Sequence, residues 1–337
     1  FEIMGELRAA YPHLPLVTAI GDIRDERKLE TTFRAHHPQV VFHAAAHKHV
    51  PLMEAHPDEA VNNNVLGTLK LCQAADGFGV ECFVMISTDK AVNPMNAMGA
   101  SKRVAEMIVQ DMNRRSPTRF VAVRFGNVLG SRGSVIPTFK RQIAAGGPVT
   151  VTDPEMRRYF MTIPEAVQLV LEAGHLAQGG EIYLLKMGEP VKIVDLARDM
   201  IRLSGLQEGV DIPLLFTGAR PGERLFEELR TDGENVEQTS HPDIVRLRGQ
   251  EVDASWLEHG VEALRLLVRD GDCQTIHDAL VALGQGKDLE AIVGVREMLA
   301  GAKEAAAAED DRTDPLADLA SRTRPAQLHR LDPAQSE

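Results

Sequence analysis

The chain has 337 residues, of which 44% are apolar and 26% are charged, as is typical of a soluble globular enzyme with one large domain or a domain and a smaller lobe. Its 49 acidic residues against 37 Lys and Arg give a net charge of −12, which argues against a nucleic-acid or anionic-membrane surface. No segment reaches the roughly 18 to 20 apolar residues that a membrane-spanning helix needs. Three cysteines without a CxxC pair suit a reducing compartment.

Short apolar runs alternate with longer helical patterns in the first 150 residues. The apolar runs at residues 16–20, 40–45, 82–86 and 120–125 predict buried parallel strands. Amphipathic patterns between them predict helices over residues 26–36, 60–75 and 97–114. This alternation predicts an α/β fold, a Rossmann-like doubly wound parallel sheet that binds its ligand beyond the carboxyl ends of the strands.

Beyond residue 150 the pattern loosens. Short strand-like pieces at 149–152 and 181–185 alternate with helical patterns at 164–177 and 193–203. We therefore expect a dinucleotide-binding domain over residues 1–150 and a smaller substrate lobe over 151–250, with some chain crossing between them. A helical extension over 251–299 and a disordered tail over 300–337 should follow, because the last segment has few large apolar residues.

One strand end carries the most informative motif. Ser87-Thr88-Asp89-Lys90 follows the predicted strand at 82–86, so its side chains should enter the ligand crevice. On the next helix, Met98 and Lys102 are four residues apart and share a face. Taken alone, Ser-Thr-Asp would be turn chemistry and a methionine would be core packing. The intact pattern around them favours a functional interpretation.

The run STDKAVNPMNAMGASKRVAE, residues 87–106, resembles a known enzyme family along its whole length. It is similar to the CapD-like nucleotide-sugar epimerases and dehydratases of polysaccharide biosynthesis, a branch of the extended short-chain dehydrogenase/reductases. The resemblance covers residues 1 to about 250 and implies a tightly held NAD. Most short-chain dehydrogenases have a catalytic Tyr where this chain has Met98. That replacement is typical of the branch's large, membrane-anchored members and favours dehydration of UDP-N-acetylglucosamine with C5 configuration retained.

The resemblance also implies roles for individual residues. Thr88 would bind the C4 oxygen of the sugar, Asp89 would be the acid, Lys90 the base, and Lys102 would hold the nicotinamide ribose, while Met98 cannot transfer a proton. We expect adjacent ionisable groups at a strand end to acquire useful pKa values through burial. The expected cofactor contacts are Asp22, Ile23, His43, Ala44, Ala45, Ala46, Lys48, Ser87 and Lys102. The expected substrate contacts are Asn127, Arg158, Arg220 and Glu223.

Several of these residues have simpler interpretations. Asp22 or Asp25 could cap a helix instead of contacting adenine. The histidines at 43, 47 and 49 lack a Cys or carboxylate partner at metal-ligand spacing, so we expect no metal site. An Arg is suited to phosphate and a Glu to ribose hydroxyls, but each alone would be a surface charge.

The chain departs from the family at two places. Lys186 stands where the family commonly has Asp, and no Gly-rich dinucleotide loop precedes Asp22. We therefore expect a truncated chain whose first strands are missing, leaving a gap beside the strand at 16–20.

The expected partners are a UDP-sugar and further copies of the chain. We expect a cytoplasmic location, or the cytoplasmic face of the inner membrane in a longer protein. The alternatives are a 4-epimerase or reductase and a non-catalytic nucleotide-binding fragment.

Overall fold

A six-stranded, mainly parallel sheet organises the molecule. The computed structural model describes residues 2–231, 233–248, 252–289 and 295. The strands are ordered β1-β2-β3-β8-β12-β11. The parallel part contains β1 (Val40–His43), β2 (Cys82–Ile86), β3 (Arg119–Arg124) and β8 (Ile182–Leu185). The strands β12 (Ile244–Arg248) and β11 (Asn235–Gln238) are added antiparallel. The expected doubly wound α/β class is confirmed.

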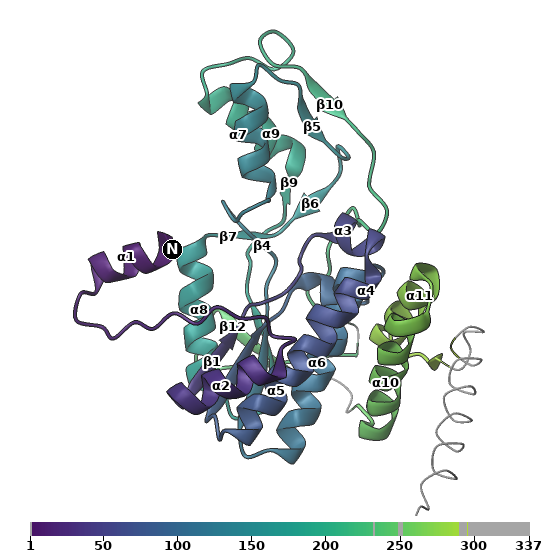
Figure 1. The fold of residues 1–337 in the computed structure, drawn as a ribbon. Coiled ribbons are helices and arrows are strands. Elements are labelled where there is room, and N and C mark those ends of the chain that lie inside the picture. The colour runs from purple at the N-terminus through teal and green to yellow at the C-terminus, as the bar shows by residue number, and fades with distance from the viewer. Residues whose placement is uncertain (1, 232, 249–251, 290–294, 296–337) are drawn as a thin grey trace, which may run out of the picture.

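Helices cover both faces of this sheet (Figure 1). One face is covered by α2 (Glu26–His36), α5 (Thr68–Gly77) and α6 (Ala97–Arg115), with α4 (Pro57–Glu59) and the π-helix η1 (Ala60–Gly67) leading into α5. The other face is covered by α8 (Ile163–Leu176). Side chains alternate along a strand, so Phe83 and Phe120 pack toward α6 while Val84 and Val121 pack toward α8.

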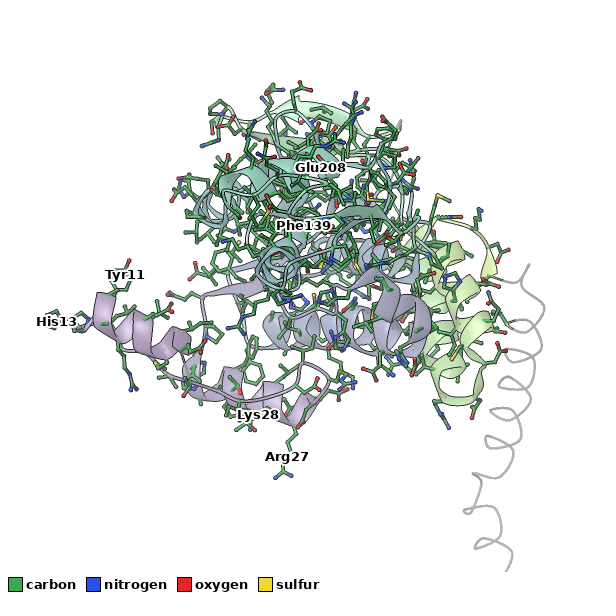
Figure 2. All side chains as sticks on the ribbon, turned by 90° about the horizontal axis from the view of Figure 1, so that it is seen from above. Tyr11, His13, Arg27, Lys28, Phe139 and Glu208 are labelled. Carbon is green, nitrogen blue, oxygen red and sulfur yellow. The ribbon has the colours of Figure 1, made fainter. Side chains whose placement is uncertain are left out.

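A smaller unit lies beyond the carboxyl ends of the strands (Figure 1). Its elements are α7 (Val135–Ala144), β5 (Val149–Val151), β6 (Arg157–Arg158), β9 (Val191–Lys192), α9 (Ile193–Leu203) and β10 (Leu214–Phe216). They enclose a separate core that includes Phe139, which Figure 2 labels together with Glu208. Because α7 precedes residue 150 and β8, β11 and β12 return to the large sheet, the chain crosses between the units several times. A short parallel pair, β4 (Asn127–Val128) with β7 (Phe160–Met161), lies at the junction.

The prediction of a strand at residues 16–20 is wrong. This segment belongs to no sheet, and Val17 and Ile20 are exposed. An apolar run becomes a strand only where a neighbouring strand satisfies its backbone groups, and no described strand pairs with it. It follows α1 (Glu2–Ala10), which projects from the body with Tyr11 and His13 at its far end (Figures 1 and 2). One edge strand of the sheet is β1, where Val40 and Phe42 are nearly half exposed.

A helical hairpin packs on the outside of α6. It consists of α10 (Ala254–Asp270) and α11 (Cys273–Gly284), and α11 lies beside α6 (Figure 1). The contact is close, because a Cβ at Gly284 would lie 3.0 Å from the Cα of Ala100. The expected tail over 300–337, and the end of the predicted helix except residue 295, lie outside the described residues. Within the described ranges, no helix is long and apolar enough to cross a bilayer.

A buried charge network ties the strand ends to α6. The fully buried Arg124 guanidinium donates to Glu106 at 2.6 and 2.7 Å and to Glu234 at 2.9 and 3.0 Å. The Ser87 hydroxyl also donates to Glu106, at 2.6 Å. Burial would raise the pKa of Glu106, but the Arg124 charge outweighs this and lowers that pKa to about 2. Because the carboxylates satisfy the guanidinium, the network fixes the end of β3 against α6.

Replacing Glu106 with Gln should destabilise the fold, because Arg124 would keep a buried charge with less compensation. We expect a loss of about 3 to 5 kcal/mol in the free energy of unfolding, measured by urea denaturation. As a matched control, Glu30→Gln removes an exposed pair with Arg34 and should change it by less than about 0.5 kcal/mol. Equal effects of the two changes would contradict the importance of the network.

Candidate active site

The strand ends and the small unit enclose a cavity of about 520 Å³. The motif-bearing loops that follow β1, β2 and β3 all reach this cavity because those strands are parallel. Twelve of the residues selected from the sequence line it: Ala44, Ala46, Lys48, Ser87, Thr88, Lys90, Met98, Lys102, Asn127, Arg158, Arg220 and Glu223. The other five do not form its wall: Asp22, Ile23, His43, Ala45 and Asp89.

A tight turn presents the catalytic candidates. Residues Asp89–Ala91 form a 3-10 turn, η2, capped by the Thr88 side chain, and the Asp89 backbone N–H donates to the carbonyl of Phe125 at 3.1 Å. The turn packs directly on the first turn of α6. A Cβ at Gly99 would overlap the carbonyl oxygen of Lys90, so only glycine allows this approach. The close packing brings Lys90 and Met98 to the same cavity.

The Lys90 amine is held in an ion pair inside this turn. Its Nζ lies 2.9 Å from Oδ1 of Asp89, which also accepts a hydrogen bond from the Thr88 hydroxyl at 2.9 Å. Burial opposes the charge on Lys90, but the carboxylates of Asp89 and Glu227 outweigh it and raise the pKa of the amine. The second oxygen of Asp89 is buried and has no hydrogen-bond partner among the described residues. Asp89 therefore lies behind Thr88 and Lys90 with one oxygen uncommitted.

The second lysine of the site has the opposite electrostatics. Lys102 is 5% exposed, and burial lowers the pKa of its amine to about 8, with Glu106 opposing this only in part. Nearby, burial and then the charge of Lys102 lower the pKa of His43 to about 3. His43 shares a hydrogen bond of 2.8 Å with the Thr68 hydroxyl, and its buried Nδ1 has no partner among the described residues. His43 therefore lies beneath the cavity as a neutral ring.

Lys102 should make the stability of the apo protein depend on pH. The unfolded chain keeps this proton up to about pH 10.5, whereas the folded chain loses it at about pH 8. The unfolded state thus binds more protons between these values, and stability should rise with pH by roughly 3 kcal/mol. Urea titrations of the wild type and Lys102→Met across this window measure the difference. An unchanged slope in the variant would contradict a buried, depressed amine.

The expected adenine contacts lie outside the cavity wall. Asp22 is exposed and pairs with Arg24 at 2.8 Å, and hydrogen bonds from Arg24 lower the pKa of Asp22 to about 2. The cap of α2 is Asp25, which accepts from the backbone N–H of Lys28, so of the two candidate caps the structure selects Asp25. No group of three or more His, Cys, Asp or Glu within the described ranges could hold a metal ion.

The residues expected to contact substrate differ in how far their side chains are already engaged in hydrogen bonds and ion pairs. The Arg158 guanidinium donates to the carbonyls of residues 157, 224 and 225 at 2.7 to 3.2 Å, so most of its donors are already used. Arg220 is exposed at the cavity and has no ion pair within the part of the chain that the structure describes. Its backbone N–H donates to Glu223 at 3.3 Å. The Asn127 side-chain oxygen lies 3.5 Å from Lys90 Nζ. Of the two arginines, Arg220 is the freer to meet an anion.

Two buried acids near the site were missed from the sequence. Glu106 follows Lys102 by four residues on α6, so helical spacing alone would have placed both on one face. Glu227 lies in an irregular segment, 3.6 Å from Lys90 Nζ and 3.6 Å from Arg158 Nε. No periodicity marks it in the sequence.

The arrangement defines a class of protein. Helices cover both faces of a mainly parallel sheet, and the Thr-Asp-Lys turn and Lys102 lie at a cavity beyond the strand ends. This is the arrangement of an extended short-chain dehydrogenase/reductase, with Met98 in place of the usual tyrosine. Within that class, the chain belongs to the family described as polysaccharide biosynthesis protein, whose sequence model matches residues 2–249.

Known proteins similar to this chain agree with that assignment. EpsC of Bacillus subtilis, a probable polysaccharide biosynthesis protein, is 57% identical over 244 residues, which are 72% of this chain and 40% of EpsC. The capsular polysaccharide biosynthesis protein CapD of Staphylococcus aureus is 57% identical over 248 residues, 73% of this chain and 41% of CapD. The chain thus spans about two fifths of the length of these relatives.

One more distant relative is named as a nucleotide-sugar enzyme, and one solved structure is also similar. A UDP-glucose 4-epimerase of Rickettsia typhi is 39% identical over 228 residues, which are 66% of this chain and 64% of that enzyme. The X-ray structure of Pen from Bacillus thuringiensis superposes with a TM-score of 0.68 at 36% identity, covering 75% of this chain and 78% of Pen.

Proposed function

We propose that this chain carries the catalytic site of an NAD-dependent dehydratase that converts UDP-N-acetylglucosamine to a UDP-4-keto-6-deoxy-hexosamine with C5 configuration retained, for a surface polysaccharide or glycan. The observation that supports this most directly is the buried Asp89–Lys90 pair at the cavity beside Met98. Elimination of water needs both an acid and a base, and this pair can supply both. The protein would lie in the cytoplasm or on the cytoplasmic face of the inner membrane.

The cavity suits the nicotinamide end of a dinucleotide. Ala44 and Ala46 present small side chains to the wall, Ser87 lies beside them, and the amine of Lys102 can hold a ribose hydroxyl. Lys48 adds a positive charge at the rim. When bound, NAD would take a hydride from C4 of the sugar and return it to C6. Arg220, Glu223 and Asn127 would face the nucleotide and sugar.

The elimination itself needs only the groups of the turn, while water takes the proton that the C4 hydroxyl loses on oxidation. A proton shift along the 2.9 Å contact turns the ion pair into a neutral Lys90 amine and a protonated Asp89. The amine then takes the C5 proton and the C6–O bond breaks. Asp89 protonates the leaving oxygen, through the Thr88 hydroxyl or by turning about its side-chain bonds. The ion pair is thereby restored, and Lys90 can return a proton to the same face of C5, which gives retention. The Lys90 amine then takes a proton from water, which replaces the one that the C4 hydroxyl gave up, so the pair ends as it began.

A 4-epimerase or reductase on the same fold is the second candidate, and the Rickettsia typhi relative is named for that activity. An epimerase would use a proton-transferring Tyr where Met98 stands and has no need of an acid and base for elimination. A nucleotide-binding fragment without catalysis would have no use for the buried Asp89–Lys90 pair either.

Identifying the product tests the proposal. The full-length protein, incubated with NAD and UDP-N-acetylglucosamine, should release a 4-keto-6-deoxy sugar nucleotide that NMR identifies by its C6 methyl group. A C4 epimer as the only product, formed by protein that binds UDP, would overturn the dehydratase proposal in favour of the epimerase.

Replacing Asp89 with Asn tests its role as the acid while nearly preserving the shape of the side chain. Asn has nearly the same shape but cannot supply a proton, so we expect turnover to fall by at least about 100-fold while UDP binding is kept. Calorimetry with UDP and product formation by NMR give the two readouts. Turnover within a few fold of wild type would remove Asp89 from the mechanism.

A further inference from the structure

A second carboxylate, that of Glu227, faces the Lys90 amine. Glu227 lies in the irregular segment between β10 and β11, with a side chain that is 5% exposed. Its Oε1 is 3.6 Å from Lys90 Nζ and 3.6 Å from Arg158 Nε. Charged groups this deeply buried are stable only when they are compensated. The Glu227 carboxylate therefore compensates the charges of both Lys90 and Arg158.

Arg158 fixes where Glu227 can lie. The Arg158 guanidinium is held by the carbonyls of Arg157, Arg224 and Leu225, the last two of which come from the same segment as Glu227. Because this cation is anchored to backbone, the carboxylate beside it has little freedom. The charged groups that face Lys90 are thus Asp89, Glu227 and Arg158, with Asn127 as the polar neighbour.

We propose that Glu227 is a positioning residue that holds the Lys90 amine against Asp89 and sets the balance between the ion pair and the neutral pair. Its negative charge favours the ammonium form of Lys90, and Arg158 limits that effect by neutralising part of the charge. Glu227 belongs to the same segment as Arg220 and Glu223. A ligand that moves this segment would therefore also change the ratio of the ion pair to the neutral pair. The inference rests on the proposed function for the reaction that the pair performs.

The step that Glu227 controls is a proton shift without any change in electron count. The Nζ–H bond of Lys90 breaks, an Oδ1–H bond of Asp89 forms, and both charges disappear. Removing the charge of Glu227 should make the ammonium less stable, so the pKa of Lys90 should fall. The proton that the pair shares would then be lost at lower pH, and the basic limb of the kcat profile should move down with it.

The direct test measures the Lys90 amine itself. Competitive acetylation of the full-length protein over a pH series, with peptide mass spectrometry, gives the pKa of Lys90 whatever reaction the enzyme catalyses. We expect Glu227→Gln to lower it by about one pH unit, as is usual for loss of an opposite charge at this distance. The basic limb of kcat should shift by the same amount with little change in KM.

Matched variants distinguish this role from a structural one. Glu228→Gln makes the same chemical change one residue away, at a half-exposed side chain that accepts from Asn93 and lies 3.8 Å from Arg224, so it should leave the pKa of Lys90 unchanged. Glu227→Asp keeps the charge and should restore the wild-type pKa at least in part. An unchanged pKa of Lys90 in Glu227→Gln, or equal shifts in both Gln variants, would overturn the proposal. Because acetylation needs no turnover, this outcome is distinguishable from failure of the dehydratase proposal.

Discussion

The buried ion pair between Arg124 and Glu106 is the interaction on which the site depends. Arg124 ends β3 and Glu106 lies on α6, and both side chains are fully buried. Each ion alone would be strongly destabilising at this depth, so the two elements are held in one relative position. Ser87, at the end of β2, donates to the same carboxylate. One pair thus aligns two strand ends with the helix that carries Met98 and Lys102.

Around this anchor, segments far apart in the sequence hold the first turn of α6. Asn96 caps the helix through the backbone N–H of Gly99 and donates to the carbonyl of Gly222. Glu54, from α3 (Val50–Ala55), accepts from the backbone N–H of Ala97 at 2.7 Å. Gln285, beyond the end of α11, donates to the carbonyl of Pro94 at 2.7 Å. The outer hairpin therefore contacts the loop that carries the reactive groups, although it lies outside residues 2–249 of the family match.

The sequence predicted those parts of the fold that are determined locally. The strands at 82–86 and 120–125 are short, apolar and covered on both faces, so their composition alone identifies them. The run at 16–20 has similar composition but lacks a partner strand, which composition cannot reveal. The strand β12 was missed because its charged Arg246 and Arg248 hide a buried alternation of Val245 and Leu247.

The candidate site likewise has a part that the sequence predicts and a part that it does not. Residues at strand ends and on one helix face were predicted to meet, and the cavity brings twelve of them together, while their individual roles stay proposals. Glu227 could not be predicted, because only tertiary packing brings an irregular segment to Lys90. The position of Asp89 relative to the cavity also could not be predicted from the sequence. Its place in the motif suggested direct access to the ligand, but the packing of Gly126 and Thr88 puts it behind the cavity wall.

The fate of the C5 proton tests the role of the Asp89–Lys90 pair most directly. Wild-type protein and Lys90→Met would be incubated with UDP-N-acetylglucosamine and NAD in D2O, and deuterium at C5 of the sugar would be measured by NMR. If Lys90 is the base that removes and returns this proton, the wild-type product carries deuterium at C5 with its configuration retained, and the variant shows no exchange there. Deuterium at C5 in the variant, at a rate near that of wild type, would contradict the central role of the Asp89–Lys90 pair.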